Sequence, residues 1–138
     1  MNALGRNANG VASNVRCRAG SVAPMSAPIG PYTPARRVGD LLFCSGQIGK
    51  DGDVLAEGLG AQARQTIANL EALLKENGAS LDQVIKTTVF LTDMAAYSMM
   101  NEIYGELFSA PHPARSAVAV AALPAGAEIE IEAIAYVG

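Results

Sequence analysis

The sequence predicts an α+β domain in which two helices pack on one face of a mixed β-sheet. Two segments repeat apolar residues at intervals of three and four, which is the spacing of an amphipathic helix. The segments around them are short, and they either alternate apolar with polar residues or are rich in β-branched residues, as strands are. Along the chain, the expected order is hairpin, helix, strand, helix, hairpin.

The first expected elements are two short strands over 36–38 and 41–45, which turn at Gly39-Asp40. A proline-rich, extended segment precedes them, and another turn is expected at 51–53. The first helix should end near Gly78, because glycine readily adopts the left-handed conformation that closes a helix. The apolar stripe of this helix consists of Leu59, Ala63, Ile67, Leu70 and Leu74.

The second half of the chain begins with a buried strand over 83–91, which is rich in β-branched residues. Asp93 is placed to cap the second helix, and Pro111 should end it. Two alternating strands, 115–121 and 128–136, are then expected to form a C-terminal hairpin. The apolar stripe of the second helix is Tyr97, Met100, Tyr104 and either Leu107 or Phe108.

Composition and charge argue against two kinds of binding partner, nucleic acids and metal ions. The chain has 138 residues, half of them hydrophobic, which is enough for one domain with its own core. Residues 1–24 hold three arginines and no acid, so the remainder carries seven basic and thirteen acidic side chains, a net charge of −6. Such a surface repels phosphate backbones, and no nucleic-acid partner is expected. One histidine and two cysteines lack zinc-ligand spacing, so no metal is expected either.

Residues 1–24 are interpreted as a disordered or processed extension ahead of a domain over 25–138. They are rich in Asn, Gly and Ala and show no sustained apolar period. An upstream translation start before Met25 is one explanation, and organellar targeting is a weaker one because an apolar face is lacking. No stretch approaches the ~20 apolar residues of a membrane helix. A soluble, cytoplasmic protein without a membrane partner is therefore expected.

The strongest candidate for a functional site lies in the predicted C-terminal hairpin. If residues 122–127 connect its strands, the valines face isoleucines, and Arg115 with two alanines faces a row of carboxylates. A notch floored by small residues beside a guanidinium suits a small anion, because arginine holds a carboxylate with two parallel hydrogen bonds. An ordinary salt-bridged solvent face is the alternative. The carboxylates are Glu128, Glu130 and Glu132.

A second candidate is the run Cys44-Ser45-Gly46-Gln47. Ser45 could act as a nucleophile only with a base, and His112, the sole histidine, follows a proline without an orienting acid. A catalytic triad is therefore not expected. Ser45 is instead interpreted as a hydroxyl donor at a strand end, with Gly46 allowing close approach of a ligand, and a plain turn is the alternative.

Six segments together resemble the RidA/YjgF imine deaminase family in order and spacing. The similarity runs from about Ala27 to the C-terminus, and PARS followed by IEIEAIA is its most specific part. The segments are IGPYTPA (29–35), CSGQIG (44–49), AQARQTIANL (61–70), IKTTVFLTDM (85–94), PARSAVAV (113–120) and EIEIEAIAYV (128–137).

This resemblance implies a fold, an assembly and a reaction. The fold would be chorismate-mutase-like, and the protein a homotrimer with active sites between subunits. The implied activity is hydrolysis of 2-iminobutanoate and 2-iminopropanoate to 2-oxo acids and ammonia, without a cofactor. The alternative is a non-catalytic trimer that binds metabolites or acts like a chaperone.

The resemblance also assigns residue roles. Arg115 would grip the substrate carboxylate, and Glu130 would be associated with the attacking water. Arg115 would also keep nearby carboxylates ionised. Ala117 stands where the family often has cysteine, which enlarges the pocket and bears on substrate range. The implied substrate-binding residues are Tyr32, Ser45, Gly46, Asn101 and Ala117.

Overall fold

The computed structural model describes Pro28 and residues 30–138, so the interpretation of residues 1–24 lies outside the described residues. The strands are β1 (Ala35–Val38), β2 (Leu41–Ile48), β3 (Lys50–Asp51), β4 (Val54–Leu55), β5 (Val84–Leu91), β6 (Ala114–Ala119) and β7 (Ile129–Tyr136). The helices are α1 (Gly58–Glu76) and α2 (Tyr97–Leu107), with short 3-10 turns η1 (Leu81–Gln83), η2 (Met94–Ala96) and η3 (Pro124–Gly126).

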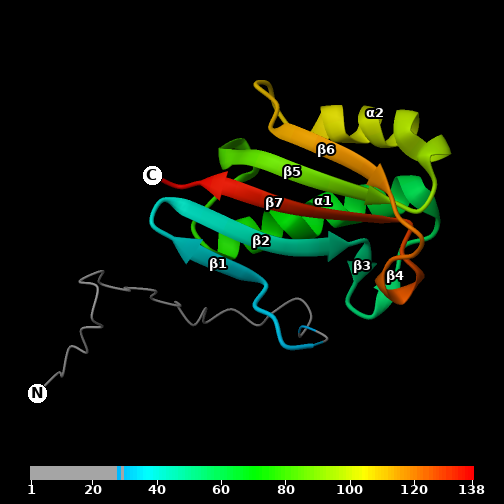
Figure 1. Cartoon of the computed structure of the whole chain (residues 1–138), viewed down its shortest axis with the longest axis horizontal. Coiled ribbons are helices and arrows are strands. Elements are labelled where there is room, and N and C mark those ends of the chain that lie inside the picture. The colour runs from blue at the N-terminus through cyan, green and yellow to red at the C-terminus, as the bar shows by residue number, and fades with distance from the viewer. Residues whose placement is uncertain (1–27, 29) are drawn as a thin grey trace, which may run out of the picture.

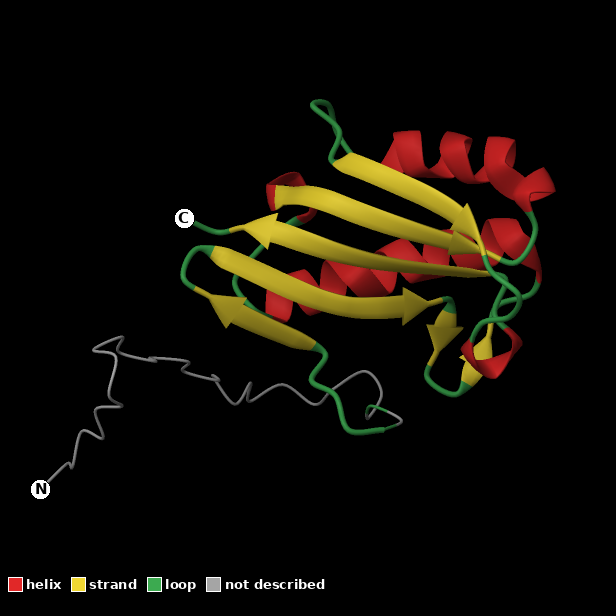
Figure 2. Cartoon of the chain, viewed as in Figure 1, coloured by secondary structure: helices red, strands yellow, loops and turns green. Residues whose placement is uncertain are grey.

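The main sheet has five strands in the order β1-β2-β7-β5-β6, while β3 and β4 form a separate ribbon (Figure 1). Both helices lie on the same side of this sheet, which leaves its other side uncovered (Figure 2). The predicted α+β class and the two helices on one face are therefore confirmed. The first hairpin is confirmed as well, because β1 pairs antiparallel with β2 across the turn at Gly39.

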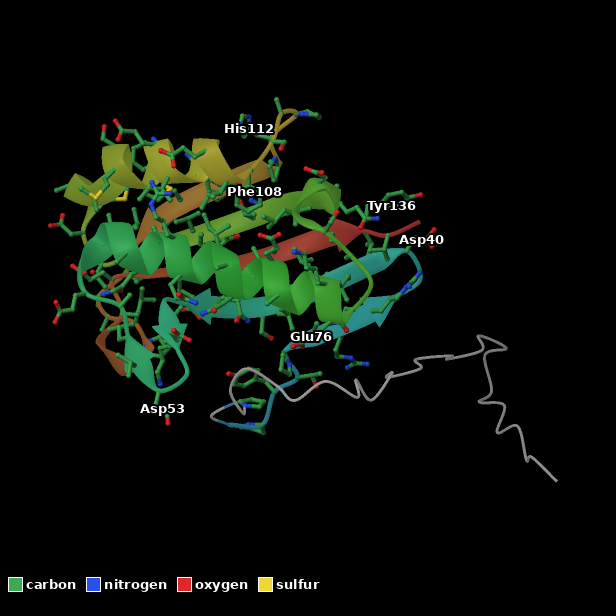
Figure 3. All side chains as sticks on the ribbon, turned by 180° about the vertical axis from the view of Figure 1, so that it is seen from behind. Asp40, Asp53, Glu76, Phe108, His112 and Tyr136 are labelled. Atoms are coloured by element: carbon green, nitrogen blue, oxygen red, sulfur yellow. The ribbon has the colours of Figure 1, made fainter. Side chains whose placement is uncertain are left out.

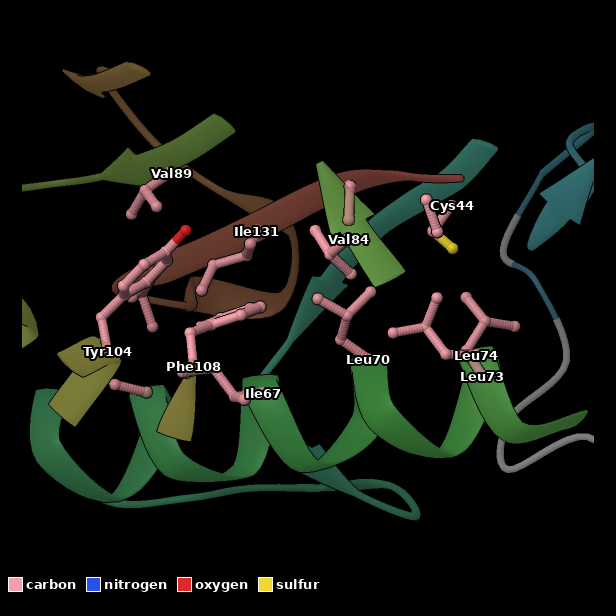
Figure 4. Close-up of a cluster of buried hydrophobic side chains, with 14 of the residues drawn as sticks. Cys44, Ile67, Leu70, Leu73, Leu74, Val84, Val89, Tyr104, Phe108 and Ile131 are labelled. Carbon is pink, nitrogen blue, oxygen red and sulfur yellow. The ribbon is translucent and has the colours of Figure 1, made fainter. Parts of the chain in front are cut away.

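Helix α1 buries its predicted stripe against the sheet and ends at the predicted glycine. Gly78 has φ 74° and its N–H donates to the carbonyl of Lys75, while Ala79 N–H donates to the carbonyl of Leu74. A left-handed glycine with these bonds is a common way for a helix to end. Figure 4 shows the α1 side chains that point into the core, among them Ile67, Leu70 and Leu74.

Helix α2 begins one turn later than predicted. Asp93 accepts a hydrogen bond from Ala95 N–H at 2.9 Å, so it caps η2, and α2 continues from there. The rings of Tyr104 and Phe108 are buried and stack with centroids 4.4 Å apart. Tyr97, the first residue of the predicted stripe, stays 38% exposed.

The predicted C-terminal hairpin is wrong. Strand β6 pairs in parallel with β5, whereas β7 lies antiparallel between β2 and β5. Because α2 connects β5 to β6, these strands form a crossover unit, and such a connection joins parallel neighbours. The alternation along each strand shows which side chains share a face, but it does not identify the neighbouring strand.

The uncovered side of the sheet exposes several apolar side chains beside charged ones such as Arg36, Lys86 and Glu132. We call it the open face. Phe43 pairs with Ile134, and Val118 pairs with Phe90, and each pair points to this side. The exposed apolar residues of the open face are Val38 (55%), Phe43 (42%), Val118 (44%) and Tyr136 (50%). A surface of this kind is typical of a contact with another protein chain.

Two expectations from composition, on membrane helices and on metal sites, concern the described residues. Neither α1 nor α2, nor any other helix in this part of the chain, has the length and apolar character to cross a membrane. Within Pro28 and residues 30–138, no group of three His, Cys, Asp or Glu side chains is placed to hold a metal. Cys44 is buried, and burial raises the pKa of its thiol to about 11, so this thiol is protonated at neutral pH.

Candidate active site

Arg115 lies on the helix-covered side of the sheet, on the edge strand β6. It pairs with Thr87, which is fully buried and shares a 2.7 Å hydrogen bond with the hydroxyl of Tyr104 in α2. Paired residues of neighbouring strands point to the same side, so Arg115 extends along α2. Ala117 follows two residues later on the same side and packs against the core.

Four side chains of α2 surround the guanidinium of Arg115. Its Nη2 donates to Asn101 Oδ1 at 2.7 Å and to the Tyr97 hydroxyl at 3.1 Å. Its Nη1 lies 3.8 Å from the sulfur of Met100. Its Cζ lies 4.8 Å from the ring centre of Tyr104 and 5.6 Å from that of Tyr97, within the range of cation–π contacts. We call these five residues the arginine half-site.

No carboxylate in the described part of the chain forms an ion pair with Arg115. The ion pairs found there join Arg64 to Glu106 and Lys75 to Glu71. A guanidinium that is held in place without a counter-charge is suited to bind a small carboxylate with charge-assisted hydrogen bonds. The arginine half-site therefore has the chemistry of an anion-binding site.

Glu130 lies on the opposite side of the same sheet. Its neighbours along β7, Ile129 and Ile131, are fully buried beneath the helices, so Glu130 points to the open face. The predicted arrangement, in which Arg115 faces the carboxylates of β7, is therefore wrong within one chain. The sheet itself separates the two side chains.

Gly46 makes room for the Glu130 carboxylate. The register of β2 against β7 shifts after Cys44, where Ser45 and Gly46 together oppose Glu132. This is a β-bulge, a feature often found next to functional sites. A Cβ at Gly46 would lie 2.7 Å from Cδ of Glu130 and 2.9 Å from its Cγ, closer than real contacts allow. Glycine at position 46 is thus needed for this approach.

The bulge opens into a cleft of about 900 Å³ at the edge of the sheet, beyond the end of β1. Ser45 ties the preceding loop to β2, because its hydroxyl donates to the carbonyl of Thr33 and its N–H to that of Pro34, both at 2.8 Å. The predicted site residues in the wall of this cleft are Tyr32, Ser45, Gly46 and Glu130, and Glu132 lies beside them. We call these five residues the glutamate half-site.

The pKa of Glu130 is raised above its ordinary value. Burial is the larger cause, and the negative charge of Glu132 is the second. Arg115 does not act on this carboxyl group, because it lies beyond the sheet. The expectation that Arg115 keeps these carboxylates ionised therefore does not hold within one chain.

The predicted row of three carboxylates is wrong at Glu128. Its Oε2 accepts a hydrogen bond from Gln62 Nε2 at 3.2 Å, and its N–H donates to Gln62 Oε1 at 2.8 Å. Gln62 belongs to α1, so these bonds join the start of β7 to the helix layer. Only Glu130 and Glu132 point to the open face.

The remaining candidate, His112, lies on the exposed loop between α2 and β6 (Figure 3). Ser45 uses its hydroxyl to hold the carbonyl of Thr33. This gives Ser45 a structural role in the wall of the cleft, within β2, while its expected role as a donor to a ligand stays a prediction.

Three contacts of Arg115 were not predicted from the sequence, those with Tyr97, Met100 and Tyr104. All three residues were assigned to helix packing alone, and the rings of the two tyrosines lie near the guanidinium. The spacing of the tyrosines contains the missing signal, because they lie four residues before and three residues after Asn101. Those intervals place both tyrosines and Asn101 on one helix face.

The sequence of this chain is similar to the sequences of a known protein family. The family model described as Endoribonuclease L-PSP matches residues 22–137. A RutC family protein of Pyrococcus horikoshii is 47% identical over 112 residues, covering 79% of this chain and 89% of that one. A human protein named 2-iminobutanoate/2-iminopropanoate deaminase is 42% identical over 121 residues, covering 86% of this chain and 88% of that one.

A solved structure agrees with the fold. The crystal structure of RidA from the Antarctic bacterium Psychrobacter sp. PAMC 21119 superimposes with a TM-score of 0.79 at 43% sequence identity. The match covers 82% of this chain and 94% of that chain. The family model spans both half-sites, from the loop that holds Tyr32 to the strand that holds Glu130. The chain therefore belongs to the RidA/YjgF family, the family whose model is described as Endoribonuclease L-PSP.

Proposed function

We propose that this protein hydrolyses 2-imino acids to 2-oxo acids and ammonia, in sites that form between copies of the chain. The observation that carries the proposal is the guanidinium of Arg115, which Asn101 and Tyr97 hold in place while no carboxylate neutralises it. The name of the human relative, 2-iminobutanoate/2-iminopropanoate deaminase, supports the same substrate class.

The division into two half-sites supports a homo-oligomer. Arg115 and Glu130 lie on opposite sides of one sheet, so a complete site needs the arginine half-site of one copy beside the glutamate half-site of the next. A contact between two different surfaces is heterologous, and repeating it forms a closed ring when the rotation between neighbours closes. The open face, with its exposed apolar side chains, is the surface that a neighbouring copy would cover. The family resemblance sets the expected number of subunits at three.

In the assembled site, Arg115 and Asn101 bind and orient the substrate through its carboxylate. The imine carbon, which is strongly electrophilic when the nitrogen is protonated, then lies over the cleft beside Glu130. Glu130 in its ionised form accepts a proton from water as the water oxygen attacks that carbon. Glu130 passes this proton to the amine nitrogen of the adduct, and then accepts the proton of the adduct's hydroxyl group as the carbonyl forms. The C–N bond breaks with its electron pair going to nitrogen, and the 2-oxo acid and ammonia leave.

Positioning supplies most of the acceleration in this scheme. Holding water and substrate in attack geometry can lower a barrier by several kcal/mol, up to ~7–11 kcal/mol for well-oriented reactants. Glu130 is suited to the proton transfer because a raised pKa makes it a stronger base than an ordinary carboxylate. Gly46 allows this carboxylate to lie in the cleft wall, where water enters.

The test is a competition assay. Threonine dehydratase generates 2-iminobutanoate in solution, and semicarbazide traps the part that is not hydrolysed. We expect the protein to lower the yield of trapped product in proportion to its concentration. Binding of 2-oxobutanoate without any effect on trapping would favour the non-catalytic metabolite-binding alternative. Salt-sensitive cleavage of RNA without any effect on trapping would favour a nuclease.

Replacing Glu132 with glutamine should shift the pH dependence of the reaction. The negative charge of Glu132 raises the pKa of Glu130, so its removal lowers that pKa. Glu130 acts in its ionised form, and activity is lost as the pH falls through its pKa. The acid limb of the kcat/KM profile should therefore move to lower pH in Glu132→Gln. An acid limb that stays in place or moves to higher pH would contradict the role given to Glu130.

A further inference from the structure

The hydroxyl of Tyr97 accepts a hydrogen bond from an N–H group of Arg115 that a carboxylate ligand would need. A guanidinium carries five N–H groups, and two parallel bonds to a carboxylate use either Nε with Nη2 or Nη1 with Nη2. Each arrangement therefore requires one N–H of Nη2. In the structure, the two N–H groups of Nη2 donate to Asn101 and to Tyr97. A carboxylate must displace one of these acceptors to be held by two bonds.

Tyr97 is the acceptor that can leave. Its bond to Arg115 is 3.1 Å long, whereas the bond from Arg115 to Asn101 is 2.7 Å long. Asn101 is half-buried within α2, but Tyr97 is 38% exposed and is the first residue of that helix. A side chain at an exposed helix end can turn outward as a whole, which carries the phenol oxygen into water, where it keeps its hydrogen bonds, so its departure has a small cost.

We propose that Tyr97 gates the arginine half-site, since its hydroxyl caps Arg115 in the empty site and the ligand carboxylate displaces it. The inference rests on the proposed function only in taking Arg115 as the carboxylate site. The ring of Tyr97 moves with its hydroxyl, because the phenol oxygen is fixed in the ring plane, so its peripheral contact with the guanidinium at 5.6 Å is given up as well. The competing hydroxyl lowers the affinity for 2-imino and 2-oxo acids and speeds their release. Tyr97 is thus a positioning residue that acts through Arg115.

Removing the hydroxyl alone should tighten ligand binding. In Tyr97→Phe the ring remains, and water replaces the hydroxyl as the partner of Nη2. We expect 2-oxobutanoate to bind about three- to tenfold more tightly by isothermal titration calorimetry, the scale of one hydrogen bond to a charged group partly compensated by water. The methyl ester of 2-oxobutanoate, which lacks the carboxylate, should show no such gain. Tyr136→Phe deletes a hydroxyl at the far end of β7 and should leave the affinity unchanged.

A second measurement follows the hydroxyl directly. The chain holds four tyrosines and no tryptophan, so selective ¹³C labelling of tyrosine gives a sparse NMR spectrum in which Tyr97→Phe identifies the Tyr97 signal. Titration with 2-oxobutanoate should shift the ¹³Cζ signal of Tyr97 to that of a solvent-bonded phenol. The signal of Tyr136 should not move.

The outcomes separate the two proposals. Equal or weaker binding of 2-oxobutanoate to Tyr97→Phe, or a Tyr97 signal that is unchanged at saturation, would overturn the gating role and leave the deaminase proposal standing. A wild-type protein that neither binds 2-oxobutanoate nor competes with semicarbazide would overturn both. Tighter binding by Tyr97→Phe together with a shifted Tyr97 signal would support the gate even in a protein that binds without turnover.

Discussion

Replacing Arg115 with alanine should lower kcat/KM for 2-imino acids by about 10²- to 10³-fold, the largest effect expected from one side chain. The substrate loses two charge-assisted hydrogen bonds to its carboxylate, each worth about 1.5–3 kcal/mol, and with them its orientation toward water. The competition assay with semicarbazide gives the activity. Thermal unfolding should change little, because the guanidinium is only half-buried and water can replace it.

Two further variants test whether the loss of activity is specific to the guanidinium of Arg115. Arg115→Lys keeps the positive charge but loses the planar fork, so we expect its activity to lie between that of the alanine variant and that of wild type. Arg64→Ala removes another arginine, one whose ion pair with Glu106 is exposed, and it should leave activity unchanged. If Arg115→Ala competes with semicarbazide as well as the wild-type protein does, the proposed function loses its basis.

The second large effect should come from replacing Gly46 with alanine, which adds only one methyl group. This methyl group would overlap the carboxyl group of Glu130 in its present position. Glu130 must then move out of the cleft wall, and a displacement of about 1 Å in an active site can lower activity about 10²-fold. The competition assay should show a loss of this size with normal folding by circular dichroism.

Gly105→Ala is the matched control for this glycine. Gly105 lies on the exposed side of α2, and a Cβ there would meet no atom within 4 Å. Alanine should stabilise the helix by roughly 0.5–1 kcal/mol and leave activity unchanged. If Gly46→Ala is as active as Gly105→Ala, then the close approach of Glu130 to position 46 has no part in the reaction.

Local features of the fold could be predicted from the sequence because local patterns determine them. The stripe of α1, its end at Gly78 and the hairpin at Gly39 depend on residues that are close along the chain. The order of strands in the sheet depends on contacts between distant segments. Alternation identified the buried side of β7 correctly, but not that of β6, where Ala117 packs against the core and Val118 is exposed. The crossover through α2 decides that β6 lies beside β5 and which of its sides the helices cover.

The same limit applies to the candidate site. The resemblance selected Arg115 and Glu130, but a sequence does not show on which side of a distant strand each residue lies. Their separation by the sheet follows from the register of β6 with β5 and of β7 with β2. The spacing within α2 places Tyr97 on the same helix face as Asn101, but the contact between Tyr97 and Arg115 depends also on how α2 lies along β6, which that spacing does not show.

The central claim is that one active site takes Arg115 from one copy and Glu130 from another. Complementation between two inactive variants tests it most directly. Arg115→Ala and Glu130→Gln should each be inactive alone, because each lacks one half of every site. Co-expression with different affinity tags yields mixed oligomers, and sequential purification on both tags isolates them.

We predict that the mixed oligomers regain activity. In a ring of three subunits that contains both variants, one of the three sites combines an intact arginine half-site with an intact glutamate half-site, so activity should approach about a third of the wild-type value. Mixed oligomers that are no more active than the two variants assayed separately would contradict the claim, because no site in them would then combine Arg115 and Glu130 from different copies.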